Sequence, residues 1–462
     1  MTDLADLSAA ELLAAYKARR LSPVEVTEAV IARIGAWEPR LDALYAYDPE
    51  GARAQAKASE VRWAKGEALP LDGVPGTIKE NIRTKGVAVP LGTAATDLSP
   101  AADDAPPAAR LREAGLVILG KTTMPDYGML SSGLSSFHRL ARNPWDITKN
   151  PGGSSAGAGS AGAAGYGPLH VGTDIGGSIR LPAGWCGLVG LKPSFGRVPI
   201  DPTYYGRVAG PMTRTVADAA LMMRELSKPD ARDGMSLPPQ EIDWLALDID
   251  VKGLRIGLQL DAGIGLPVEP ETRAAIVAAA KAFAEAGAII EPVSPYLTRA
   301  MIDGLDDFWR QRAWVDIGAL PMEKQAKVLP YIFHWAQGGR DLPGDRVYRG
   351  MSQMMAMRDS ALKAILPYDF ILSPVSPVPS FPAEWASPID DHAKPFEHIC
   401  FTVAANMSDQ PAISVHAGLT AGGLPIGLQI TGKRFDDLGV LRMARAWERM
   451  RGEAIRWPAL PA

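Results

Sequence analysis

Residues 150–180 read NPGGSSAGAGSAGAAGYGPLHVGTDIGGSIR, and the interpretation of the whole chain depends on this stretch. No Asp, Glu, Lys or Arg occurs between Lys149 and Asp174, but glycine and serine are too frequent for a membrane span. The β-like run 169–172 distinguishes the stretch from a flexible Gly/Ser linker. Glycines let backbone N–H groups approach a ligand, and successive free N–H groups form an anion-binding concavity. The stretch therefore predicts a structured binding region.

Two common motifs match parts of this region. Residues 157–162 fit the dinucleotide fingerprint G-x-G-x-x-G, but that fingerprint must follow a strand, and here it follows an Asn-Pro-Gly-Gly turn. Residues 153–157 fit G-x-S-x-G, the nucleophile elbow of the α/β-hydrolases. The elbow would make Ser155 the nucleophile of an esterase, and it requires a downstream histidine that has no recognisable context here.

A third pattern joins three blocks that lie apart in the chain. They are GGSS at 152–155, GTDIGGSIR at 172–180, and Lys79, which follows the Gly-Val-Pro turn at 73–75. This combination resembles the amidase signature family, whose members are serine hydrolases with a Ser–cis-Ser–Lys triad. The blocks 142–145, 187–194, 196–199 and 210–218 also resemble the family. The resemblance runs from about residue 12 to about residue 432 and is weakest between about 227 and 367.

The resemblance implies a role for each member of the triad. Ser178 is expected to be the nucleophile. Ser154, in a cis peptide linkage, is expected to be the proton relay, and Lys79 is expected to be the ultimate base. The resemblance also implies an oxyanion hole made by backbone N–H groups, those of Ile175, Gly176, Gly177 and Ser178. It implies no metal and no organic cofactor.

The chemistry of amides explains why such a set is needed. An amide has a poor leaving group, so its hydrolysis needs an activated nucleophile and a stabilised oxyanion. Lys79 can serve only when neutral, so its pKa must fall from about 10.4 toward about 7, which costs roughly 4 kcal/mol. Glu80 would point to the opposite face of a strand and need not pair with it. Thr173 is expected to orient the lysine or the relay serine, and Asp174 and Arg180 to hold the nucleophile loop.

The order of predicted strands and helices indicates an α/β fold with a large mixed β-sheet and helices on both faces. We expect one amidase domain over residues 1–462. Its parts are an N-terminal helical segment (about 1–65), a signature core (about 66–226), a variable, helix-rich substrate-side segment (about 227–367) and C-terminal strands and helices (about 368–462). Ser8 and Ser22 each begin a capping-box pattern, which predicts two helices near the N-terminus.

Composition excludes several classes of function. The net charge is −4 with no long Lys/Arg run, which argues against a nucleic-acid partner. Cys186 and Cys400 are too few for a disulfide framework or a zinc site. The N-terminus lacks the pattern of a signal peptide, so we expect a cytoplasmic protein without a membrane partner. A homodimer is left open.

The substrate is predicted to be a small-molecule amide, but its identity is open. Four side chains predict an apolar pocket that favours an aryl or alkyl amide: Tyr127, Met129, Leu130 and Trp335. Arg310 and Arg312 could instead hold a substrate carboxylate. Three functions compete with a stand-alone amidase that cleaves linear amide C–N bonds. They are the glutaminase subunit of an amidotransferase complex, an α/β-hydrolase-like esterase using Ser155, and a non-catalytic anion-binding protein.

Overall fold

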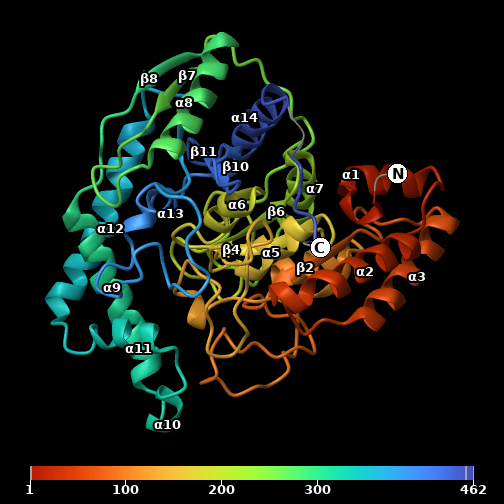
Figure 1. Ribbon diagram of the computed structural model, residues 1–462, viewed down its shortest axis with the longest axis horizontal. Coiled ribbons are helices and arrows are strands. Elements are labelled where there is room, and N and C mark those ends of the chain that lie inside the picture. Colours follow the sequence, from red (N-terminus) through yellow and green to blue (C-terminus); the bar gives the residue numbers. More distant parts are fainter. Residues whose placement is uncertain (1–2, 453–454, 461–462) are drawn as a thin grey trace.

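The computed structural model describes residues 3–452 and 455–460. Within these residues, eleven strands form one mixed sheet in the order β1-β3-β2-β4-β6-β5-β10-β11-β9-β7-β8, with helices packed around it (Figure 1). The strands are β1 (Leu44–Tyr45), β2 (Pro75–Lys79), β3 (Val117–Thr122), β4 (Leu169–Asp174), β5 (Val189–Lys192), β6 (Val208–Thr213), β7 (Arg255–Leu258), β8 (Ile289–Pro292), β9 (Phe370–Pro374), β10 (Ala412–Leu419) and β11 (Pro425–Gly432). The predicted α/β class with a large mixed sheet is confirmed.

The helices are distributed along the whole chain. They are α1 (Ala9–Lys17), α2 (Pro23–Leu41), α3 (Pro49–Lys65), α4 (Pro106–Glu113), α5 (Ala156–Ala164), α6 (Arg180–Cys186), α7 (Val216–Leu226), α8 (Pro270–Glu285), α9 (Arg299–Gly318), α10 (Met322–Gln325), α11 (Pro330–Gln337), α12 (Gly344–Ile365), α13 (Val403–Met407) and α14 (Asp437–Met450). In the part of the chain that the structure describes, no helix combines the length and apolar character needed to cross a membrane.

The two N-terminal helices begin where the capping boxes predict. Ser8 precedes α1 and Ser22 precedes α2, and in both cases the serine hydroxyl accepts from the N3 backbone N–H while the N3 glutamate accepts from the serine N–H. Each box satisfies two donors that would otherwise lack a partner at the start of a helix.

The glycine-rich stretch forms α5, β4 and the start of α6. All nine residues of α5 are buried, because glycine, alanine and serine leave room for neighbouring backbone. A Cβ on Gly157 would lie 2.2 Å from the carbonyl oxygen of Ala43. The stretch is therefore part of the closely packed interior. The helix-rich segment predicted at about 227–367 contains the helices α9, α11 and α12.

Candidate active site

Lys79 ends β2, and its side chain is completely buried. Its Nζ lies 2.7 Å from Ser154 Oγ, 3.0 Å from Ser155 Oγ and 3.0 Å from Thr173 Oγ1. Strands β2 and β4 are parallel neighbours, and this pairing brings Lys79 to the Thr173 end of β4. The amine thus contacts hydroxyls, and no carboxylate of the described residues lies within ion-pair distance of it.

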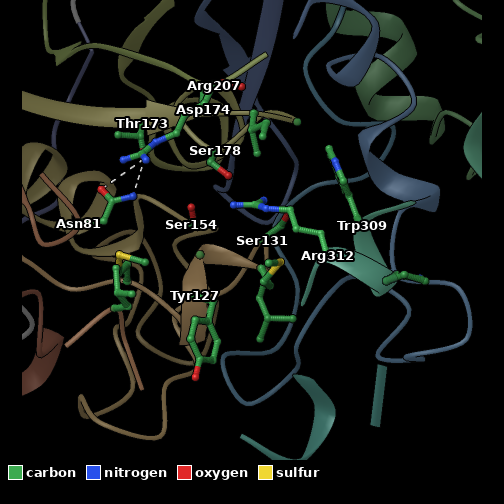
Figure 2. Close-up of a pocket in the computed structure, with 18 of the residues that line it drawn as sticks. Asn81, Tyr127, Ser131, Ser154, Thr173, Asp174, Ser178, Arg207, Trp309 and Arg312 are labelled. Carbon is green, nitrogen blue, oxygen red and sulfur yellow. Dashed lines mark hydrogen bonds between the residues drawn. The ribbon is translucent and has the colours of Figure 1, made fainter. Parts of the chain in front are cut away.

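The two serines of the predicted triad line one cavity of about 480 Å³ (Figure 2). Ser154 follows a cis peptide bond from Gly153 and is 4 % exposed. Ser178 lies in the loop between β4 and α6 and is half-buried. Lys79 lies behind Ser154, so the fold brings together the three side chains that the sequence motif joins.

Ser155 occupies a different position from Ser154. It is completely buried, and its Oγ donates to the carbonyl of Thr173 at 3.2 Å. It does not line the cavity. A nucleophile must be reachable by its substrate, so this burial argues against the esterase that the G-x-S-x-G pattern suggests.

The electrostatic setting favours a neutral Lys79. Burial lowers its pKa well below the ordinary value of 10.5, and the positive charge of Arg207 lowers it further, against the opposing charges of Asp174 and Glu80. As predicted, Glu80 points away: it accepts from the Gly92 N–H at 3.0 Å and contacts His138.

Thr173 lies beside the lysine as the sequence analysis expects, and Asn81 adds a contact that it missed. Asn81 Nδ2 donates to Thr173 Oγ1 at 3.1 Å, and both residues line the cavity (Figure 2). Asn81 lies two residues after Lys79 in the sequence. A polar side chain this close to the predicted base was the signal that could have identified it.

Asp174 and Arg180 form a buried ion pair beneath the nucleophile loop. Arg180 Nη2 donates to Asp174 Oδ1 at 3.0 Å, and both side chains are fully buried. Burial alone would raise the pKa of Asp174, but the charge and hydrogen bonds of Arg180 outweigh it and hold that pKa below its ordinary value. Arg180 also donates to Gln429 Oε1 and Asn406 Oδ1, each at 2.7 Å. The pair therefore anchors the loop to the C-terminal part of the chain.

The structure corrects one member of the predicted oxyanion hole. The N–H of Gly177 donates to Asp174 Oδ1 at 2.8 Å, so it is already engaged. Gly177 has a φ of +132°, and it does not line the cavity. Ile175, Gly176 and Ser178 do line it, which leaves their backbone N–H groups as the candidate donors.

The cavity wall matches the predicted substrate residues in part. Tyr127, Met129 and Leu130 line the cavity. Trp335 does not, because it is buried within the helical layer and its Nε1 donates to Asp306 at 2.8 Å. Trp335 lies in the segment where the family resemblance is weakest. Its aromatic side chain alone was not sufficient to show whether it lines the cavity.

Of the two predicted arginines, only Arg312 lines the cavity. Arg310 forms an ion pair with Asp306 at 2.8 Å and donates to the carbonyl of His392. Among the lining residues that sequence reasoning missed are Ser131, Arg207 and Trp309. They come from segments outside the motif blocks, and no local pattern marks them.

No cluster of three or more potential metal ligands occurs among residues 3–452 and 455–460. The chemistry available to the site is that of two hydroxyls, a buried amine whose pKa is lowered, and backbone N–H donors. That set suits acyl transfer through a serine.

Comparison with known proteins agrees with this geometry. The family model described as Amidase matches residues 25–441. The chain is 35% identical to a glutamyl-tRNA(Gln) amidotransferase subunit of Myxococcus xanthus, with 96% of this chain and 97% of that protein covered. It also resembles the crystal structure of a bacterial aryl acylamidase of the amidase signature family, with a TM-score of 0.89, 31% identity and 96% of each chain covered. The peptide amidase of Stenotrophomonas maltophilia gives a TM-score of 0.84 at 27% identity and 99% coverage of each chain. The chain belongs to the amidase signature family.

Proposed function

We propose that this protein is an amidase that hydrolyses a linear carboxamide to a carboxylate and ammonia or an amine through an acyl-enzyme on Ser178. One observation carries the proposal: a buried lysine that pairs with no carboxylate of the described residues lies 2.7 Å from Ser154 Oγ, and Ser154 shares a cavity with Ser178. A neutral lysine in this position can accept a proton that a hydroxyl passes on.

The proposed cycle uses only groups of this chain. Ser178 Oγ attacks the amide carbonyl carbon, and its proton passes through Ser154 Oγ to Lys79 Nζ. The backbone N–H groups of Ile175 and Gly176 stabilise the oxyanion. Ser154 returns a proton to the leaving nitrogen, the C–N bond breaks, and water repeats the path to release the acid.

A fluorophosphonate tests this assignment, because it forms a stable adduct with an activated serine. We expect one adduct on the wild-type protein, mapped by peptide mass spectrometry to Ser178, and none on Ser178→Ala. Lys79→Met should label far more slowly because the base is lost. Ser155→Ala is the matched control and should retain the adduct on Ser178. An adduct on Ser155 in the wild type would contradict the proposal, and no adduct at all would favour a non-catalytic binding protein.

A second candidate is a glutaminase-type subunit of an amidotransferase complex. It is favoured by relatives that are 34–35% identical and carry the name of a glutamyl-tRNA(Gln) amidotransferase subunit. Both candidates share the Ser178 chemistry and differ in whether a partner protein is required.

A further inference from the structure

The active-site cavity has two arginines that form no ion pair with any carboxylate of the described residues. Arg83, Arg207 and Arg312 all line it, and of these Arg83 is paired, with Asp201 at 2.6 Å and Asp103 at 3.3 Å. For Arg207 and Arg312, no carboxylate of the described residues lies within 4 Å. Both arginines are charged at neutral pH, so two cations remain in the wall of the cavity.

Arg207 lies beside the reacting groups. Its side chain is half-buried, and its Nη1 has a long contact of 3.4 Å with the carbonyl of Pro202. Burial lowers the pKa of Arg207 to about 10, and the like charge of Arg312 contributes to that shift. Arg207 lines the same cavity as Ser154 and Ser178, so an anion bound to it would lie in the space that holds the reacting groups.

Helix α9 presents the second arginine from the opposite wall. Trp309, Arg312 and Asp316 lie on one face of this helix and all line the cavity. The Arg312 guanidinium lies 3.8 Å from the ring centroid of Tyr204, which holds it in place, and it extends toward Ser154 and Ser178 (Figure 2). Asp316 is exposed and lies beyond ion-pair distance of Arg312. The other lining carboxylate, Asp174, is paired with Arg180. Among the described lining residues without an ion-pair partner, two are cations and one is a carboxylate, so the cavity retains positive charge.

Trp309 adds a hydrogen-bond donor without a partner. The side chain is 6 % exposed, and its Nε1 has no acceptor among the described residues. Its ring packs against the nucleophile loop, since a Cβ on Gly176 would lie 3.3 Å from it. Trp309 therefore contributes an aromatic surface beside the nucleophile loop.

We infer that the preferred substrate is an amide that carries a carboxylate, bound by Arg207 and Arg312, with its apolar part against Tyr127, Met129 and Leu130. The inference rests on the proposed amidase function and names the class of its substrate. Guanidinium and carboxylate groups form paired, charge-assisted hydrogen bonds, and these give both affinity and orientation.

Two matched pairs of substrates test the inference. Glutaric acid mono-4-nitroanilide and hexanoic acid 4-nitroanilide differ in charge on the acyl side. N-acetyl-4-aminobenzoate and 4-acetamidoacetophenone differ in charge on the amine side. We expect the wild type to prefer the anionic member of at least one pair by about tenfold or more in kcat/KM, the effect of one charge-assisted interaction.

Arginine variants then assign the preference. Arg207→Gln and Arg312→Gln should each reduce the ratio of kcat/KM for the anionic and uncharged members by about tenfold. The ratio is internal to each protein, so partial unfolding or a changed pKa of Lys79 does not alter it. Arg310→Gln is the matched control on the same helix and should leave the ratio unchanged.

The outcomes separate this inference from the proposed function. Equal or faster turnover of the uncharged members, with ratios unaffected by Arg207→Gln and Arg312→Gln, overturns the carboxylate inference and leaves the amidase intact. Failure of both turnover and fluorophosphonate labelling overturns the amidase and the inference together. Where labelling occurs without turnover, protection of Ser178 by glutarate decides: protection lost in both variants supports the inference, and absence of protection overturns it.

Discussion

Burial lowers the pKa of Lys79, and the two carboxylates that act in the opposite sense both have partners of their own. Asp174 is paired with Arg180, and Glu80 contacts His138 and a backbone N–H. Either carboxylate, placed beside the amine, would favour the charged form and remove the base. At the scale of single residues, the site therefore depends on where its negative charges are held.

Arg207→Gln is expected to shift the pH dependence of catalysis. Arg207 lowers the pKa of Lys79, so removing its charge raises that pKa toward the ordinary value of 10.5. Lys79 is active only when neutral, and the acidic limb of the kcat/KM profile should therefore move to higher pH. The profile is measured with an uncharged anilide. Arg207→Lys retains the charge and should keep the wild-type profile, whereas a limb that stays in place or moves to lower pH in Arg207→Gln would contradict the assignment.

At the scale of elements, the nucleophile loop is held from below by one carboxylate. Asp174 ends β4 and accepts from the backbone N–H groups of Gly177 and Ile179, at 2.8 and 3.1 Å. The same carboxylate pairs with Arg180 at the start of α6. The loop conformation and the beginning of the helix thus share one acceptor.

Asp174→Asn should destabilise the fold strongly. It leaves the buried charge of Arg180 without its partner, which typically costs about 3–5 kcal/mol in the free energy of unfolding. Denaturant titration with a circular dichroism readout measures the change. Asp345→Asn is the matched control, since Asp345 and Arg349 form an exposed pair one helical turn apart, and its effect should stay within about 0.5 kcal/mol. A loss below about 1 kcal/mol in Asp174→Asn would show that the loop does not depend on this pair.

The elements near the motif blocks were predictable from the sequence, and much of the cavity wall was not. The two capping boxes and the strand that ends at Lys79 are specified by short-range patterns in the sequence. The elements α1, α2 and β2 therefore lie where expected. Trp335 was misplaced and Arg207 was missed because their positions depend on how distant segments pack. Gly177 was assigned to the oxyanion hole because a motif does not specify which way each N–H points.

At the scale of the whole molecule, the comparisons point to two kinds of relative. The glutamyl-tRNA(Gln) amidotransferase subunits match at 34–35% identity over nearly the full chain. A bacterial aryl acylamidase gives a TM-score of 0.89, whereas the corresponding amidotransferase structure from Thermotoga maritima gives 0.79. The fold of this chain is therefore more similar to that acylamidase structure than to that amidotransferase subunit structure.

The purified chain is accordingly expected to hydrolyse a simple anilide without any partner. Size-exclusion chromatography coupled to activity measurement checks this, because activity should coincide with the peak of the pure chain. The same fractions also give its oligomeric state, for which a homodimer stays a prediction. An inactive chain that gains glutaminase activity only when its amidotransferase partner proteins are added would identify it as part of such a complex instead.

The origin of the cavity wall has a consequence for how the protein can change. Lys79 ends β2, Ser154 lies just before the buried α5, and Ser178 lies in the loop between β4 and α6. This region is closely packed, since a Cβ on Gly157 would meet backbone at 2.2 Å. Arg312 and Trp309 come from α9, a separate helix that packs against α11 and α12. Selection or laboratory evolution can therefore alter substrate preference through α9 while the reaction machinery stays fixed. Libraries restricted to the cavity face of this helix should yield new specificities with few inactive clones.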